Sequence, residues 1–135
     1  MASFLLDSHV FLWAKEDPGQ IDEKALETIS APENRLFVSL AGLWELAIKA
    51  GNGKLPLYSL IIEKGADALS KSLHESDMEL MPIELSHALA AAALPQHHRD
   101  PFDRLMIAQA LAENMILITR DTVFARYAGL NLLRA

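Results

Sequence analysis

The sequence contains no cysteine among its 135 residues. This absence excludes disulfide bonds, thiolate metal sites and a cysteine nucleophile. It is also typical of proteins that work in a reducing compartment, and we therefore expect a cytoplasmic location.

Long apolar runs are missing as well, since none approaches the roughly 18 to 20 residues that cross a bilayer. The apolar start, MASFLLDSHVFLWA, is interrupted by Asp7 and His9 and carries no preceding basic residue. We therefore expect neither a secretory signal nor a membrane association. Hydrophobic residues make up 51% of the chain and charged residues 22%, which is a globular balance. The length predicts a single domain over residues 1–135.

Basic residues are in the minority, with 12 Lys and Arg against 18 Asp and Glu and a net charge of −6. Taken alone, this balance argues against a nucleic-acid binder, because phosphate contacts usually come from a basic surface. The objection weakens if several acids lie together and hold divalent cations, since bound metal reverses the local field. Net charge therefore does not decide the function.

Short apolar runs alternate with helical patterns along the chain. The runs predict strands at residues 2–6, 36–38, 78–83, 115–119 and 130–133. Apolar spacing and end signals predict helices at residues 8–14, 22–30, 40–50, 58–73, 84–94 and 100–113, with a helical turn at 122–127. This alternation predicts an α/β fold with a parallel sheet covered on both faces. Such folds place their sites beyond the carboxyl ends of the strands.

Two acids, Asp7 and Asp121, directly follow expected strands. Each has a structural alternative as the N-cap of the helix or helical turn after it, and for Asp7 alone the cap is the favoured interpretation. Glu45 lies four residues before Lys49, which is the spacing of a surface ion pair. Residues 36–48 contain no other charged residue, however, and an isolated acid in an apolar helix is costly unless something pairs with it. A metal ion is one candidate.

The segment Asp100-Pro101-Phe102-Asp103 has the pattern of a helix start. Asp100 is expected to be the N-cap. Asp103 then projects from the first turn, where the helix dipole keeps a carboxylate ionised and able to bind a cation. We expect Asp7, Glu45, Asp103 and Asp121 to face one crevice.

Clustered carboxylates suit hard cations such as Mg²⁺ or Mn²⁺, which prefer oxygen ligands. Such ions lower the pKa of a bound water, orient it toward a phosphodiester and neutralise charge on the leaving oxygen. Nothing else in the sequence supplies a nucleophile with a base beside it. The acids therefore predict metal-dependent phosphodiester cleavage.

Three segments resemble the PIN-domain family, and most closely its bacterial VapC-type toxin branch: LLDSHVFLW, SLAGLWELAIKAGNGKL and LPQHHRDPFDRLMIAQALAENMILITRD. The resemblance implies a three-layer α/β/α sandwich with a parallel five-stranded sheet. It implies an endoribonuclease that depends on Mg²⁺ or Mn²⁺, is inhibited by a cognate antitoxin and usually forms a homodimer. Carried over by position, the catalytic and metal-binding residues are Asp7, Glu45, Asp103 and Asp121, with Asp7 and Asp103 as the main ligands.

Several neighbours of these acids have weaker claims. Arg99, Arg104 and Arg120 are candidates for RNA phosphate contacts, or they balance the carboxylates electrostatically. Asp100, Thr119 and Ser39 are candidates for supporting the metal ligands by hydrogen bonds, although a strand-end Thr and an N-cap Ser need no such role. Adjacent residues such as His97 and His98 rarely converge on one ion, so we do not expect them to form a transition-metal site. Residues 58–73 are candidates for contacts with a second protomer or an antitoxin, but an amphipathic helix more often faces its own core.

Two other functions remain open on the sequence alone. A phosphoryl-transfer domain would use an acid after the first strand, but His9 stands where a phosphatase motif needs a second Asp, and Arg120 stands where a receiver domain needs a Lys. A non-catalytic module would keep the acids for metal or partner binding.

Overall fold

The computed structural model describes residues 2–53 and 64–135. Its strands are β1 (Ser3–Leu6), β2 (Arg35–Ser39), β3 (Met78–Met81), β4 (Ile116–Thr119) and β5 (Asn131–Arg134). All pair in parallel in the order β3-β2-β1-β4-β5. The predicted parallel sheet is confirmed, with strand ends that differ by one or two residues from those expected.

The described helices are α1 (Ser8–Glu16), α2 (Glu23–Ser30), α3 (Leu40–Gly51), α5 (Ala66–Glu75), α6 (Leu85–Ala93) and α7 (Pro101–Ala112), with short 3₁₀ helices η1 (Pro18–Gln20) and η2 (Thr122–Arg126). The helix predicted over 58–73 is wrong as one continuous element. Gly65 has a φ of +94°, which no helix interior accepts, and α5 begins only at the next residue. The part of that prediction over 58–63 lies outside the described residues.

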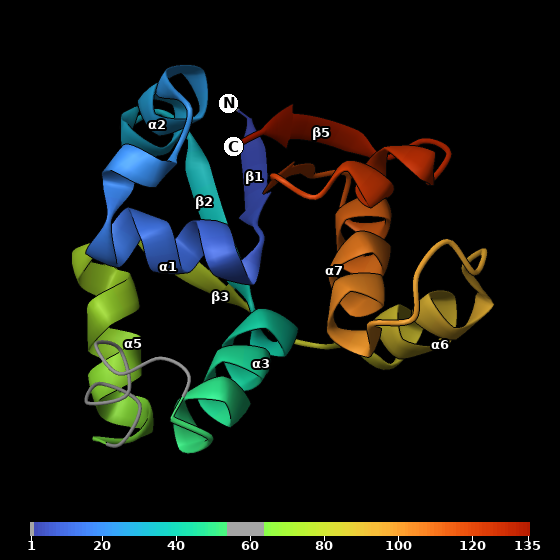
Figure 1. The fold of residues 1–135 in the computed structure, drawn as a ribbon, viewed down its shortest axis with the longest axis horizontal. Helices are drawn as coiled ribbons and strands as arrows, with labels where there is room; N and C mark the ends of the chain where they lie inside the picture. The colour runs from blue at the N-terminus through green and yellow to red at the C-terminus, as the bar shows by residue number, and fades with distance from the viewer. Residues whose placement is uncertain (1, 54–63) are drawn as a thin grey trace.

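The sheet separates two apolar layers because successive strand residues point to opposite faces. Phe4 and Leu6 belong to one cluster with buried residues of α1, α2, α3 and α5, whereas Leu5 belongs to the other with the buried face of α7. Figure 1 shows α1, α2 and α5 on one side of the sheet and α6 and α7 on the other. The expected α/β/α sandwich is therefore observed.

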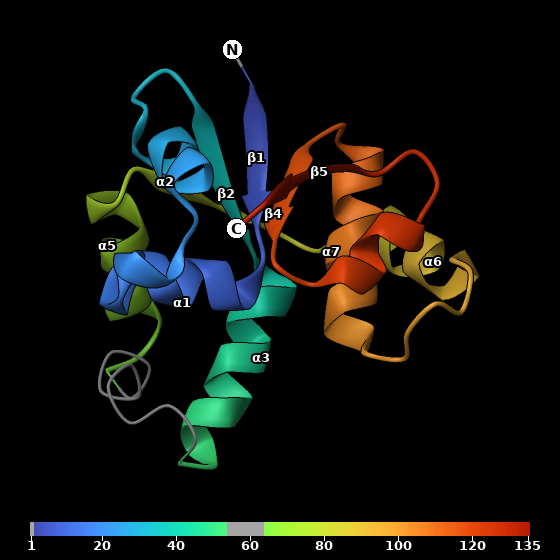
Figure 2. The same ribbon diagram turned by 45° about the horizontal axis from the view of Figure 1, so that its top comes forward.

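The order of the strands creates a switch point beside β1. The chain moves from β1 outward to β2 and β3, and then returns past β1 to β4 and β5. The connection after β1 leads toward β2, whereas the connection after β4 leads toward β5 on the other side. Because the two connections diverge, a crevice opens at the carboxyl ends of β1 and β4. Helix α3 extends away from this edge (Figure 2). No helix in residues 2–53 and 64–135 is long and apolar enough to cross a membrane.

Candidate active site

Asp7 directly follows β1 and is buried, with only 8% of its surface exposed. It occupies the N-cap position of α1, but its side chain makes no capping hydrogen bond, so the favoured interpretation as a helix cap is wrong. One carboxylate oxygen instead accepts a hydrogen bond from Thr119 Oγ1 at 2.8 Å, and the other lies 3.4 Å from Ser8 Oγ. A backbone hydrogen bond from Asp7 N to Ile118 O holds the end of β1 beside β4.

Asp121 comes to the same edge from β4. Its backbone N–H donates to Thr119 Oγ1 at 3.1 Å, so a single hydroxyl connects Asp121 with Asp7. One carboxylate oxygen of Asp121 accepts from Val123 N at 2.9 Å. The predicted N-cap of the helical turn is confirmed, and Asp121 also faces the crevice.

Glu45 is buried on α3, with 7% of its surface exposed. It pairs with Lys49 at 3.1 Å, as the spacing predicted, and accepts a hydrogen bond of 2.8 Å from Ser8 Oγ. Helix α3 lies very close to α1 here, since a Cβ at Gly42 would lie only 3.4 Å from the Cβ of Ser8. Ser8 therefore connects Glu45 to Asp7 from the start of α1.

Asp103 comes from the first turn of α7, where Asp100 is the N-cap. Asp100 accepts hydrogen bonds from Phe102 N and Asp103 N, which confirms its predicted capping role. Burial raises the pKa of Asp103 to about 8, with further contributions from Asp7, Asp100, Glu45 and Asp121. Without a bound cation this carboxyl is thus largely protonated at neutral pH, so the expectation that the helix dipole keeps it ionised is wrong: burial and the neighbouring acids outweigh the dipole.

Burial also raises the pKa of Asp7 above its ordinary value. The hydrogen bond from Thr119 and the nearby His9 act in the opposite direction, and the charge of Glu45 adds to the increase. For both Asp7 and Asp103 burial is the largest cause of the raised pKa, and the charges of neighbouring acids add to it.

The four acids meet in one pocket of about 160 Å³, which also contains three other side chains; its lining is Asp7, His9, Trp13, Glu45, Asp103, Arg120 and Asp121. A second hollow of about 390 Å³ continues from Glu45 along α3 to the start of α7. The donor set is mostly carboxylate oxygen in a partly buried site with excess negative charge. These residues fit a divalent metal ion.

The arginines near the acids differ in their surroundings. Arg99 is exposed on the loop before α7. Arg120 stacks on Trp13, with its guanidinium 4.4 Å from the ring centroid, and donates to the carbonyl oxygens of Gln20 and Ala135. Arg120 therefore forms one wall of the pocket and holds the C-terminal residue in place.

Arg104 has neither of the two roles predicted for it, contact with RNA phosphates or electrostatic balance of the carboxylates. Its guanidinium is buried and donates to the carbonyl oxygens of Ala91, Leu94 and Pro95 at 2.8 to 3.0 Å. These carbonyls lie at the end of α6, where backbone acceptors lack helical partners. Arg104 thus fastens α6 to α7.

Thr119 supports the acids directly, as described, whereas Ser39 does not. The Ser39 hydroxyl accepts from Ala41 N at 3.0 Å and donates to Gln109 Oε1 at 2.5 Å. It is the N-cap of α3, and it also connects α3 to α7.

Sequence reasoning missed the contributions of Ser8, His9, Trp13 and His98. The position of Ser8 and His9 directly after a strand-end acid was an available signal. His98 Nε2 lies 3.5 Å from Asp103 Oδ2, while the ring of the adjacent His97 packs edge-on against Tyr127. The two histidine rings therefore have different surroundings.

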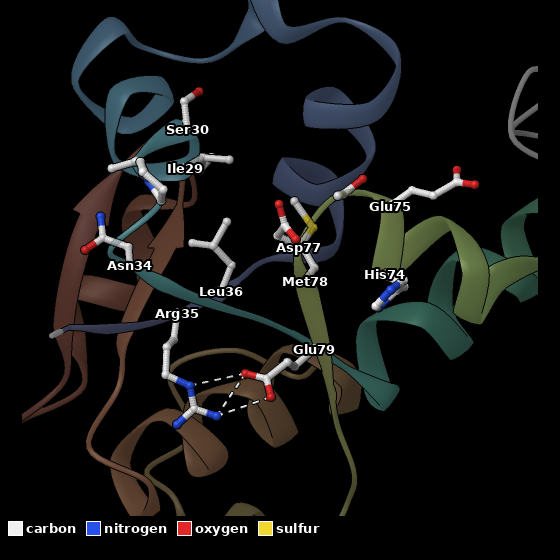
Figure 3. Close-up of a pocket in the computed structure, with 13 residues that line it drawn as sticks. Ile29, Ser30, Asn34, Arg35, Leu36, His74, Glu75, Asp77, Met78 and Glu79 are labelled. Atoms are coloured by element: carbon white, nitrogen blue, oxygen red, sulfur yellow. Dashed lines mark hydrogen bonds and ion pairs between the residues drawn. The ribbon is translucent and has the colours of Figure 1, made fainter.

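A larger hollow, of about 650 Å³, lies at the opposite end of the strands, near the first residues of β2 and β3 (Figure 3). Its most prominent polar contact is the ion pair between Arg35 and Glu79 at 2.9 Å, and both side chains are half exposed. None of the four acids lines it. The size of a hollow is therefore not a guide to the chemistry of this molecule.

The fold and the pocket together define an α/β protein with an acidic site at a switch point, and comparison with known proteins identifies its family. The PIN domain family model matches residues 4–130. The chain is also 30% identical over 122 residues to Ribonuclease VapC22 of Mycobacterium tuberculosis. The matched region covers 90% of this chain and 88% of that protein. This chain belongs to the PIN-domain family.

Solved structures show the same fold. VapBC2 from Rickettsia felis, bound to a DNA fragment from its promoter, superposes with a TM-score of 0.70 at 21% identity over 98% of both chains. The DNA-bound VapBC of Salmonella typhimurium gives a TM-score of 0.66 at 20% identity, covering 99% of this chain and 98% of that one. At these identities the likeness concerns the fold.

Proposed function

We propose that this chain is a single-domain, metal-dependent endoribonuclease that hydrolyses RNA phosphodiester bonds. The observation that carries the proposal is the meeting of Asp7, Glu45, Asp103 and Asp121 in one pocket at the switch point of the sheet. Membership of the PIN-domain family and the named ribonuclease among its relatives support the same activity.

The four acids would hold Mg²⁺ or Mn²⁺, with Asp7 and Asp103 as main ligands and Glu45 and Asp121 completing the set. When bound, such an ion supplies an activated water and neutralises charge on the leaving oxygen. Thr119 and Ser8 orient the carboxylates of Asp7 and Glu45 through their hydrogen bonds. The buried carboxylates repel unshielded phosphate, and cleavage would therefore depend on the cation.

RNA would approach along the hollow that continues from Glu45 toward the start of α7. Lys49 lines this hollow, and the exposed Arg99 lies on the loop that leads into α7. Their positive charge would offset the acidic balance of the whole chain where the phosphates pass. RNA binding would then rely on these cationic side chains near the acids and would not require a basic surface over the whole chain.

The relatives' names suggest the biological setting, a toxin paired with an antitoxin, because the solved VapBC structures include toxin–antitoxin complexes. We propose that a cognate antitoxin binds this chain, that the chain forms a homodimer, and that it acts in the cytoplasm. Large apolar side chains are exposed on α3 and α6, including Trp44 with 56% of its surface accessible and Leu85 and Leu89. Such surface suits protein contacts.

Cleavage of a labelled RNA by the purified protein tests the activity. We expect cleavage with Mn²⁺ or Mg²⁺ and none with a chelator, and we expect Asp7→Asn and Asp103→Asn to lose it while remaining folded. Glu79→Gln, at the opposite end of the strands, is the matched control and should cleave normally. Binding of Mn²⁺ with intact RNA would instead indicate the non-catalytic module, and full activity of Asp103→Asn would overturn the assignment.

A further inference from the structure

The imidazole of His98 is held firmly at the edge of the acidic pocket. His98 lies on the loop between α6 and α7, and 14% of its side chain is exposed. Its Nδ1 atom forms a hydrogen bond of 2.7 Å with the hydroxyl of Tyr127. The ring also packs against Phe124, with 5.3 Å between the ring centroids. These contacts fix the direction of the other ring nitrogen.

That nitrogen, Nε2, has no hydrogen-bond partner although it is buried. In the described part of the chain it is the one buried side-chain nitrogen or oxygen in this condition. Asp103 Oδ2 lies 3.5 Å away, too far for a good hydrogen bond. One ring nitrogen of His98 and one carboxylate oxygen each of Asp103 and Asp121 all lie within 4.8 Å of one another.

This spacing is close to that of ligands around one metal ion. Ligands about 2.1 Å from an octahedral ion are separated by about 3 Å when adjacent and about 4.2 Å when opposite. A ligating histidine usually donates its second ring N–H to an oxygen, which fixes the tautomer. Here Nδ1–H can donate to the Tyr127 oxygen, and the Nε2 lone pair then points toward the two carboxylates.

We propose that His98 Nε2 is a nitrogen ligand, together with Asp103 and Asp121, of the divalent cation that the proposed function requires. The inference rests on that function and adds an imidazole ligand to the carboxylates that the function assigns to the cation. Imidazole favours transition-metal ions, whereas Mg²⁺ is held by oxygen ligands. His98 thus biases the site toward Mn²⁺ over Mg²⁺.

Electron spin-echo spectroscopy of Mn²⁺ bound to the full chain tests the inference, because the modulation detects a nitrogen nucleus coordinated to the ion. The wild-type protein should show nitrogen coupling, and labelling only its histidines with ¹⁵N should change the coupling frequencies. His98→Gln should lose the coupling. His97→Gln is the matched control and should keep it, since the ring of His97 packs on Tyr127.

Titration of the two ions gives a second measurement. His98→Gln should weaken Mn²⁺ binding about tenfold or more and change Mg²⁺ binding much less. Bound Mn²⁺ without nitrogen coupling in the wild-type protein would overturn the ligand role and leave the nuclease proposal standing, with His98 merely orienting Asp103. Coupling that persists in His98→Gln would also overturn it. Absence of any bound Mn²⁺ would overturn both proposals.

Discussion

The hydroxyl of Thr119 donates a hydrogen bond of 2.8 Å to Asp7 Oδ2, across 112 positions of sequence. The two residues meet because β1 and β4 are neighbours in the sheet and their carboxyl ends lie at the same edge. The same hydroxyl accepts from the backbone N–H of Asp121. Thr119 therefore positions two of the four acids of the pocket from the end of one strand.

Replacing Thr119 by Val tests this positioning role, because Val keeps the shape and removes both hydrogen bonds. We expect Mn²⁺ affinity to fall about 10- to 100-fold, since partners that orient metal ligands typically contribute this much. Isothermal titration measures the change. Thr28→Val on α2 is the control, because its hydroxyl only donates to the carbonyl of Lys24 at an exposed position. Unchanged affinity in Thr119→Val would show that Asp7 needs no such support.

Asp103→Asn should stabilise the cation-free protein while it abolishes cleavage. Burial and four neighbouring acids make the ionised form of Asp103 costly, and Asn removes that charge. Each pKa unit corresponds to about 1.4 kcal/mol, and solvent access and relaxation reduce the effect of the full shift. We expect a gain of about 1–3 kcal/mol near pH 8, measured by urea unfolding in a chelator. The control Asp100→Ala removes a helix cap and should lower the free energy of unfolding by about 1 kcal/mol. A lower free energy of unfolding in Asp103→Asn would contradict this prediction.

The stability of the cation-free protein should fall as the pH rises. The pKa of Asp103 is raised from 3.8 to about 8 in the folded state, so the folded protein holds this proton more tightly than the unfolded chain does. The resulting stability is complete below the unfolded value and is lost as the pH passes through the folded value. Between about pH 5 and pH 8.5 the Tm should decrease as the pH rises, and saturating Mn²⁺ should abolish this decrease. In Asp103→Asn the decrease should be clearly smaller, and an equal decrease would assign the effect elsewhere.

Arg104 and Arg99 should separate stability from RNA binding. Arg104→Ala removes three hydrogen bonds from a buried guanidinium and leaves the carbonyl oxygen of Leu94 without a donor, and we expect a loss of about 2–4 kcal/mol in the free energy of unfolding. Arg99→Ala should leave unfolding unchanged, since the side chain is exposed, and should weaken binding of RNA to an inactive variant. A stable Arg104→Ala protein with weakened RNA binding would reverse these assignments.

The sequence alone predicted much of the fold because its signals are local. Apolar runs marked the strands, and Asp100 before Pro101 marked the start of α7. The order of the elements predicted the parallel sheet, and the acids after β1 and β4 pointed to the correct edge. The helix predicted over 58–73 was wrong because it includes Gly65. The apolar spacing continues through this residue, but its positive φ interrupts the helix.

The contacts of polar side chains with distant parts of the chain were decided only by the tertiary structure. Asp7 satisfies every local requirement of a helix cap, yet the neighbouring strand brings it Thr119 and its carboxylate turns there instead. Arg104 lies next to Asp103 in sequence, but the end of α6 offers it three carbonyl oxygens. His98 reaches Asp103 because Tyr127 and Phe124, beyond β4, hold its ring. Periodicity and capping are properties of neighbouring residues, whereas these contacts depend on how the sheet brings the segments together.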